Sequence, residues 1–347
     1  MIHFSYPFDF SDFSSDEAER IIELITDWKN DVSEFTFQSS GSTGKPKKLA
    51  FTREQLFASI LKTKQFFGLE KSDNALICLP IDYIAGKMMW LRSQEIGMNV
   101  TYLTPSSNPL ENTDLKNPID FAAFVPLQLQ LIIEKSPEKL TLLNNAKAIL
   151  VGGGQISNHQ NELFQQIKAP IFHTYGMTET VSHIAVKRIN GNDQSSSYQT
   201  LPLVEIDSTG NDCLRICADV TNNEWITTTD RVELLSPTSF NWLGRMDHVI
   251  NSGGVKIQLE EVEQKLQNLF DEASITNRFF LFGKDNIMLG QKLCLVIEGK
   301  VNHPTLKEIL ESFEKFEKPK AAFSVPLFIE TASAKINRKE TIKEYSL

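Results

Sequence analysis

The chain is poor in cysteine and carries no excess of positive charge. Its four cysteines, Cys78, Cys213, Cys217 and Cys294, include no Cys-x-x-Cys pair. They offer too few ligands for a zinc site and are expected to stay reduced and buried. Lysine and arginine total 35 against 44 acidic residues, a net charge of −9. Such a chain has no basic field for a polyanion, which excludes nucleic acid as a general partner.

Long hydrophobic runs are also missing. No stretch of about 18 apolar residues occurs, so no transmembrane helix is expected. The opening residues, MIHFSYPFDFSDF, contain neither lysine nor arginine and no uninterrupted apolar core. They therefore do not have the pattern of a secretory signal. Together these absences predict a cytoplasmic protein and leave its oligomeric state open.

What is present describes an ordinary globular protein. Hydrophobic residues make up 41% of the chain and charged residues 23%, and 347 residues can form two domains. Short apolar runs alternate with helical patterns, which predicts an α/β fold with a largely parallel, helix-covered sheet. Strands are expected at 75–80, 99–104, 120–126, 146–153 and 170–176. Helices are expected at 14–30, 52–67, 128–135 and 160–167. Thr52 and Gln55 form a capping box for the second of these helices, and Gly68 is its expected stop.

The pattern changes after Gly244. A helix is expected at 259–270, then a hairpin within 279–299 that bends at Gly283-Lys284-Asp285, then a helix at 305–316. This order predicts a small α+β unit. We therefore expect a first domain over residues 1–244 and a second over 245–347.

Residues 38–48, QSSGSTGKPKK, are the most informative stretch of the chain. Small residues let successive backbone N–H groups point at one anion, hydroxyls add neutral donors, and lysines add charge. The stretch is not a Walker A loop, because Pro46 follows Lys45 where that motif needs serine or threonine. A phosphate-binding loop and a flexible Ser/Gly linker are the two interpretations.

The remaining motifs favour the phosphate loop. The pattern [ST]-S-G-[ST]-T-G-x-P-K resembles that of the acyl-adenylate-forming superfamily, which holds acyl-CoA synthetases, peptide-synthetase adenylation domains and luciferases. Four further segments match this family in its order. They are YGMTET (175–180), TTD (228–230), GRMDHVI with its continuation (244–263) and SAKINR (333–338).

The resemblance implies an ATP site with magnesium. The β- and γ-phosphates would be held by Ser40, Gly41, Ser42, Thr43, Gly44 and Lys47. Thr178 would contact the α-phosphate, and Glu179 would bind Mg²⁺. The adenosine would be met by Gly153 and Gly154 with Tyr175 stacked on the base, and by Asp230 and Arg245 at the ribose.

The resemblance also implies two half-reactions in one chain. Lys335 would reach the acyl carboxylate and the α-phosphate during adenylation. Asp247 matches the hinge about which the family's C-terminal domain rotates. That rotation would bring Gly253, Gly254 and Lys256 to the site, where CoA accepts the acyl group. On this reading residues 1–244 bind nucleotide and acid, and residues 245–347 move.

Two departures from the family's pattern narrow the choice of substrate acid. The phosphate loop begins at residue 38, much earlier than in most relatives, and Tyr83 stands where the family often has histidine. With YIAGKMMWLR (83–92) and TETVSHIA (178–185), the chain looks like short o-succinylbenzoate–CoA ligases of menaquinone biosynthesis. The aromatic carboxylic acid would then be a dianion, bound near Tyr83 with Lys87, Arg92 or His183 at its second carboxylate. Alternatively, Arg92 pairs with Glu95 and His183 is a packed core residue.

Three other functions stay open from the sequence. The chain could be a ligase for another small aryl or acyl acid, or a stand-alone adenylation domain that loads a carrier protein. It could also be a degenerate nucleotide binder without activity. Retention of Glu179, Asp230, Arg245 and Lys335 argues against the last.

Overall fold

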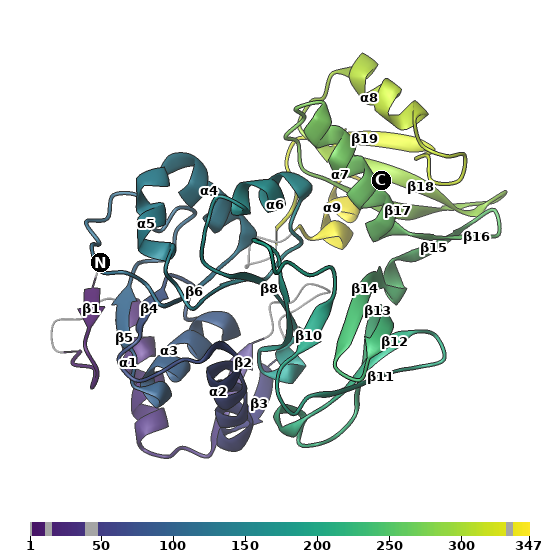
Figure 1. The fold of residues 1–347 in the computed structure, drawn as a ribbon. Coiled ribbons are helices and arrows are strands. Elements are labelled where there is room, and N and C mark those ends of the chain that lie inside the picture. Colours follow the sequence, from purple (N-terminus) through teal and green to yellow (C-terminus); the bar gives the residue numbers. More distant parts are fainter. Residues whose placement is uncertain (1, 11–15, 39–47, 331–335) are drawn as a thin grey trace.

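The computed structural model describes residues 2–10, 16–38, 48–330 and 336–347. Figure 1 shows a large sheet unit joined to a smaller unit that contains the C-terminus. In the described chain the large sheet has 12 strands in the order β1-β5-β4-β6-β7-β8-β9-β10-β14-β13-β12-β11. The chain therefore crosses from an α/β half to an all-β half within a single sheet.

Five strands of the α/β half are parallel, its edge strand β1 is antiparallel, and β4 to β7 are buried on both faces, as the apolar runs predict. In β4, Ala75 and Ile77 pack into one core cluster, whereas Leu76 packs into the other. The parallel strands are β4 Asn74–Ile77, β5 Asn99–Tyr102, β6 Phe121–Phe124, β7 Ala148–Val151 and β8 Ile171–Gly176. Their helices are α3 Ile84–Ile96, α4 Pro126–Lys135, η1 Pro137–Lys139, α5 Leu140–Leu143 and α6 Asn158–Phe164.

The other half is antiparallel, and most of its strands lack the continuous apolar runs that predicted the parallel ones. Its strands carry polar residues at many positions, as in ITTTDRVELLS of β13, so hydrophobic alternation is weak. The antiparallel strands are β9 His183–Arg188, β10 Tyr198–Thr200, β11 Glu205–Ser208, β12 Cys213–Cys217, β13 Ile226–Ser236 and β14 Ser239–Arg245, with η2 Thr178–Thr180 and η3 Asp219–Thr221 between them. The predicted α/β class is confirmed, and within the described part of the large sheet parallel pairing is confined to five strands.

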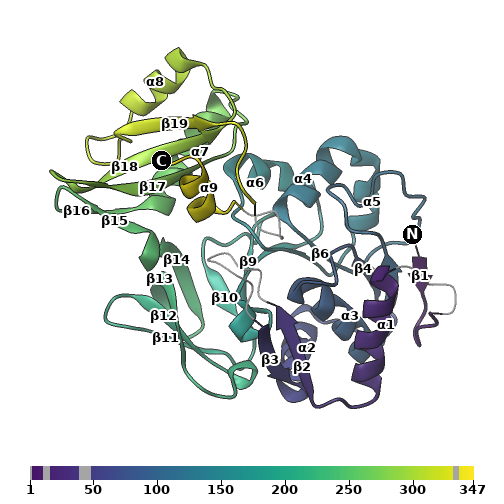
Figure 2. The same ribbon diagram turned by 180° about the vertical axis from the view of Figure 1, so that it is seen from behind.

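Local signals at the second helix are confirmed in detail. The Thr52 hydroxyl accepts a hydrogen bond from the N–H of Gln55, and the Gln55 side-chain oxygen accepts one from the N–H of Thr52. The helix α2, Arg53–Phe67, then ends at Gly68 in the left-handed region, with φ +62°. Figure 2 shows α2 beside a separate hairpin. The hairpin strands are β2 Glu34–Gln38 and β3 Lys48–Thr52, while β1 Ile2–Phe4 and α1 Asp16–Lys29 precede them.

The smaller unit has the expected α+β composition, but the predicted position of its hairpin turn is wrong. Gly283, Lys284 and Asp285 lie inside a strand, and the chain reverses after Asn286. The Asn286 side chain accepts hydrogen bonds from the N–H groups of Met288 and Leu289, and Gly290 supplies φ +74°. The elements are η4 Met246–His248, β15 Val249–Ser252, β16 Val255–Gln258, α7 Leu259–Glu272, β17 Phe279–Asn286, β18 Gly290–Glu298, α8 His303–Glu311, β19 Ala321–Val325 and α9 Arg338–Glu344.

Two exclusions from the sequence can be compared with the structure. All four cysteines are free thiols, and all except Cys217, which is half-buried, are buried as expected. Burial raises the pKa of the Cys78 thiol. Within the described ranges, no helix is both long enough and apolar enough to cross a membrane.

Candidate active site

The phosphate-loop residues predicted from the sequence, Ser40, Gly41, Ser42, Thr43, Gly44 and Lys47, lie outside the described residues, as does Lys335. The structure does place the ends of both segments. The first is flanked by Gln38 and Lys48, paired across the β2–β3 hairpin. The second is flanked by Glu330 and Ile336, which form an antiparallel bridge.

Ion pairs fix the chain on either side of the Lys335 segment. Before it, Arg278 pairs with Glu330 and holds Glu298 at 2.7 Å. After it, Arg338 pairs with the buried Glu263 at 2.9 Å. Both anchors belong to the small sheet unit, so that unit holds both ends of the segment.

The glycine turn after β7 lies at the carboxyl edge of the parallel strands. A Cβ at Gly152 would meet the Thr174 hydroxyl oxygen at 2.3 Å, so the turn packs directly on β8. Gly153 has φ +82°, a conformation that favours glycine. A Cβ at Gly154 would meet nothing closer than Pro126, at 3.8 Å. This edge is where ligands of open α/β sheets bind.

Tyr175, Asp230 and Trp242 form one hydrogen-bonded group beside that turn. The Tyr175 hydroxyl donates to Asp230 Oδ2 at 2.7 Å, and the Trp242 indole donates to Oδ1 at 3.1 Å. Burial, and then the charge of Asp230, raise the pKa of Tyr175, so the phenol stays protonated and keeps donating. The carboxylate is thus held in one orientation with lone pairs left over to accept hydroxyl protons of a ligand.

Arg245 lies next to this group and is tied to the predicted hinge. It pairs with Asp230 in the β13–β14 register, and its guanidinium grips Asp247 through bonds of 2.8 and 3.0 Å. Burial alone would raise the pKa of Asp247, but the hydrogen bonds from Arg245 lower it on balance. The carbonyl of Arg245 also accepts from Gln258 of β16 at 2.9 Å. Asp230, Arg245 and Asp247 therefore lie together where the two sheets meet.

Thr178 and Glu179 form the tip of the tight turn between β8 and β9. Glu179 is exposed and Thr178 is half-buried. In the described chain no group of three or more His, Cys, Asp or Glu side chains could by itself hold a metal ion. One free carboxylate is what Mg²⁺ takes from a protein when phosphates supply other ligands, so Glu179 fits that role and a protein-only cage does not.

His173 was not predicted as a site residue from the sequence. Its Nε2 lies 3.0 Å from the carbonyl oxygen of Gly154, and its Nδ1 lies 2.9 Å from the Tyr198 hydroxyl. Because Gly154 can only accept, Nε2 carries the proton and Nδ1 accepts from Tyr198. Burial lowers the pKa of His173 to about 4. The only signal in the sequence was its position two residues before Tyr175.

The depressed pKa of His173 predicts a pH-dependent stability. The unfolded imidazole binds a proton near its ordinary pKa of 6.5, whereas the folded one does so only near 4. Stability is therefore complete above pH 6.5 and falls as the pH drops. Between pH 7 and 5 we expect His173 to account for a loss of about 1 to 2 kcal/mol.

Urea unfolding of wild type and His173→Gln at both pH values measures this loss. Glutamine can still donate to Gly154 but does not titrate, so its stability should fall less on acidification. Parallel losses in the two proteins would show that His173 does not titrate as described.

A buried polar cluster lies behind the turn, between α2, α3 and β9. Arg92, only 3% exposed, donates to the Ser182 hydroxyl at 2.9 Å, and that hydroxyl lies 3.3 Å from His183 Nδ1. His183 Nε2 contacts the Thr63 hydroxyl at 3.4 Å. Burial, and then the charge of Arg92, lower the pKa of His183, so its ring is neutral at pH 7.

Arg92 has no carboxylate partner among the described residues, and its Nε makes no hydrogen bond there. The proposed pairing with Glu95 is wrong, because Glu95 instead accepts from the Trp28 indole at 2.9 Å. Burial lowers the pKa of Arg92 to about 9, which still leaves it charged at pH 7. A buried cation without a counter-ion is costly, and an anionic ligand would remove that cost.

Tyr83 and Lys87 lie at the start of α3. Tyr83 is the N-cap residue, and the Lys87 ammonium lies 5.4 Å from the centre of the Phe37 ring, at the end of β2. Burial lowers the pKa of Lys87. Lys87 therefore contacts the β2–β3 hairpin from the start of α3, and Arg92 lies further along the same helix.

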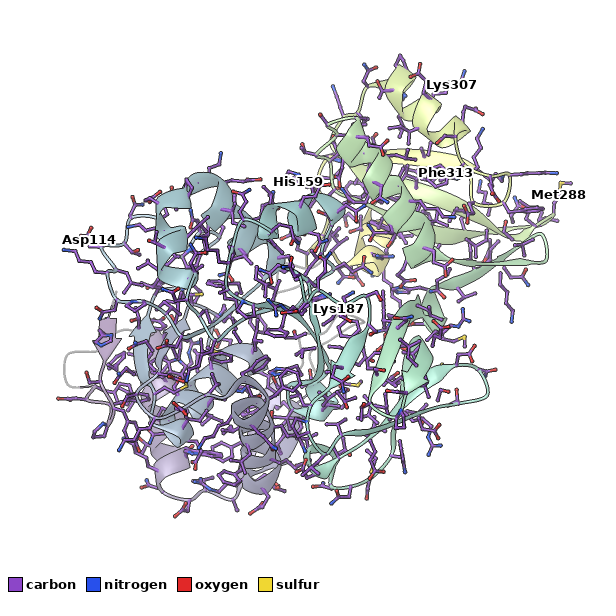
Figure 3. The ribbon with its side chains drawn as sticks, viewed as in Figure 1. Asp114, His159, Lys187, Met288, Lys307 and Phe313 are labelled. Atoms are coloured by element: carbon purple, nitrogen blue, oxygen red, sulfur yellow. The ribbon has the colours of Figure 1, made fainter. Side chains whose placement is uncertain are left out.

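Gly253, Gly254 and Lys256 are not with the other predicted residues. They lie at the β15–β16 turn, with φ +61° and +85° at the two glycines, and Gly253 donates to the Leu289 carbonyl at 2.8 Å. Figure 3 shows the neighbouring Met288 at the outer tip of the small unit, pointing away from the large sheet.

A cleft of about 860 Å³ separates the two units beside the Tyr175 group. Its walls include His173, Tyr198 and Trp242 from the large sheet and Glu260 and Gln264 from the small unit. Lys187, labelled in Figure 3 near the middle of the molecule, lies on the same wall. The site is therefore built at a junction between two units rather than within one.

Comparison with known proteins agrees with this architecture. Residues 25–209 match the family of AMP-binding enzymes. An acyl-CoA synthetase (AMP-forming)/AMP-acid ligase II-like protein from Dyadobacter fermentans DSM 18053 is 34% identical, with 99% of each chain covered and a TM-score of 0.67. The chain belongs to the AMP-binding enzyme family.

Several curated relatives are named as ligases for one particular acid. The 2-succinylbenzoate–CoA ligase of Lactococcus lactis is 25% identical over 92% of this chain and 73% of its own length, and that of Escherichia coli is 26% identical over 88% and 68%. The fold is shared with the O-succinylbenzoate Coenzyme A synthetase of Bacillus subtilis in complex with ATP and magnesium ion, at a TM-score of 0.72 and 22% identity.

Proposed function

We propose that this chain is an AMP-forming acid–CoA ligase that converts o-succinylbenzoate, ATP and CoA to o-succinylbenzoyl-CoA, AMP and pyrophosphate through an acyl-adenylate. The choice of acid rests on one observation: the guanidinium of Arg92 is buried and has no carboxylate partner among the described residues. The relatives named 2-succinylbenzoate–CoA ligase support the same assignment.

The nucleotide would bind across the β7 and β8 ends. Asp230, oriented by Tyr175 and Trp242, would accept the ribose hydroxyl protons, and Arg245 would close the other side. Gly153 and Gly154 allow a base to approach closely. Thr178 would contact the α-phosphate. Glu179 would hold Mg²⁺, which supplies charge neutralisation at the phosphates when bound.

The acid would reach inward from the turn. Its reacting carboxylate has to lie by Thr178, next to the α-phosphate. On the other side of the same turn, the Ser182 hydroxyl accepts a hydrogen bond from Arg92. A second carboxylate there would pair with the guanidinium and with neutral His183. A substrate with two carboxylates separated by an aromatic ring fits this division.

Domain rotation would follow adenylation, with residues 1–244 fixed and residues 245–347 moving. The large sheet ends at Arg245 and the small sheet begins at Val249, so few residues need to change torsion. Both ends of the segment that contains Lys335 lie on the small unit, and Gly253, Gly254 and Lys256 are exposed at the start of β16 and the turn before it. This supports assigning the present arrangement of the two units to the adenylation step.

Asp247→Pro is expected to separate the two half-reactions, because proline fixes φ at the hinge. The two half-reactions are measured as acid-dependent pyrophosphate exchange and thioester formation. The rate of one should fall by about 10²-fold, and the rate of the other should be retained. The matched control, Asp247→Ala, removes the ion pair with Arg245 but leaves φ free, and should retain both. If both steps survive in Asp247→Pro, the hinge lies elsewhere.

A pyrophosphate-release screen over carboxylic acids, with and without CoA, tests the proposed function. o-Succinylbenzoate should be the preferred acid, and CoA should yield its thioester. Equal use of benzoate or a medium-chain fatty acid would reject the substrate but retain the ligase. Adenylate formation with transfer to a carrier protein and not to CoA would identify a loading domain. No release with any acid would indicate a nucleotide binder without activity.

A further inference from the structure

The β8–β9 turn contains a conformation that side chains rarely adopt. Val181 has φ +65° and ψ −55°. The residues on its two sides are hydrogen-bonded, since the N–H of Ser182 donates to the carbonyl of Thr180 at 2.7 Å. These values describe the strained form of the γ-turn, and a β-branched residue with positive φ is an outlier. Val181 is also fully buried in the main core cluster. Packing therefore holds the residue in a backbone state that it would not choose.

The neighbouring Thr180 locks the turn from inside. Its hydroxyl accepts from the N–H of Met177 at 3.1 Å and lies 3.0 and 2.8 Å from the carbonyl oxygens of Met177 and Ser182. The side chain is wholly buried. One hydroxyl thus ties the beginning of the turn to its end.

The strands on either side leave the turn no room to relax. A Cβ at Gly176 would sit 2.3 Å from the Ser182 carbonyl oxygen, so β8 and β9 touch there backbone to backbone. The register shifts at this point, with Gly176 opposite His183 after Tyr175 opposite Ala185. Two pairs of proposed site residues, Thr178 with Glu179 and Ser182 with His183, are therefore joined through Val181.

We propose that Val181 and Thr180 are positioning residues that hold the phosphate-facing and acid-facing sides of the turn in one fixed relation. This rests on the proposed function, because it names what the turn positions. Neither residue needs to touch a substrate. The strained γ-turn at Val181 sets the direction in which Ser182 leaves the turn, and the Thr180 hydroxyl prevents that direction from changing.

A matched pair at position 181 tests the strain without any assay of activity. Val181→Gly and Val181→Ala both remove the packed side chain, but only glycine tolerates the positive φ. Val181→Gly should therefore melt above Val181→Ala, by about 3 °C or more. The opposite order would overturn the strained turn, because alanine is otherwise the more stabilising residue. This result does not depend on which acid the protein uses.

A second pair tests the positioning. Thr180→Val removes the hydroxyl at nearly constant shape, and Thr180→Ser restores it. In single-turnover adenylation, Thr180→Val should lose about tenfold to 10²-fold in rate, with the KM for ATP within about threefold of wild type. Thr180→Ser should recover most of the rate. An unchanged rate in Thr180→Val, or equal loss in both variants, would overturn the proposal, whereas an inactive wild type would reject the proposed function instead.

Discussion

Lys335→Ala is expected to remove acid-dependent pyrophosphate exchange almost entirely. The lysine lies in SAKINR, which resembles the segment whose lysine meets the acyl carboxylate and the α-phosphate in adenylate-forming enzymes. Two anions must approach each other in that step, so a positioned cation is worth about 10²- to 10³-fold in rate. The reaction of preformed acyl-adenylate with CoA should be much less affected, because the lysine would have left the site by then.

The structure provides a control for this experiment. Lys339 lies on the first turn of α9 in the same unit and is exposed. Lys339→Ala removes an equal charge and should leave both half-reactions near wild type. Loss of both half-reactions to the same degree in Lys335→Ala would show that the lysine supports the fold or the nucleotide rather than adenylation.

Arg92→Leu is expected to have opposite effects on binding and stability. Without substrate, replacing a buried cation that lacks a described counter-ion should raise the melting temperature. With substrate, the second carboxylate would lose its partner, and the KM for o-succinylbenzoate should rise about 10²-fold. The KM for ATP should change little, because Arg92 lies on the acid side of the turn.

Two comparisons isolate the carboxylate. Arg92→Lys keeps the charge but not the planar fork, and should give an intermediate KM. An aryl acid without the second carboxylate should be used equally well by wild type and Arg92→Leu. If Arg92→Leu raises the KM of both acids alike, the arginine shapes the pocket without recognising the second carboxylate.

His183 and Lys87 are the other candidates for that recognition. His183 is buried and neutral, so it can share a hydrogen bond but not an ion pair at pH 7. Lys87 lies nearer the β2–β3 hairpin, against Phe37. Arg92 is the strongest of the three because its burial without a described ion pair is costly unless an anion binds.

Local chemistry in the sequence predicted several elements correctly. The capping box of Thr52 and Gln55 and the stop at Gly68 act within a few residues, so α2 could be bounded closely. Four of the five parallel strands, β4 to β7, could be predicted because both their faces are buried, which favours short apolar runs. The position of the hairpin turn was harder to predict. The strand β17 continues through Gly283, and the chain reverses where the Asn286 side chain accepts backbone hydrogen bonds.

The sequence by itself determined the α/β class, the membership suggested by five ordered motifs, and the residue types of a nucleotide site. Only the tertiary structure decided that Arg92 meets Ser182, 90 positions away, and that His183 meets Thr63 across 120. It also decided the neutral state of His173 and the backbone of Val181. These features arise from burial and from contacts between distant segments, whereas motifs and caps arise from neighbours along the chain.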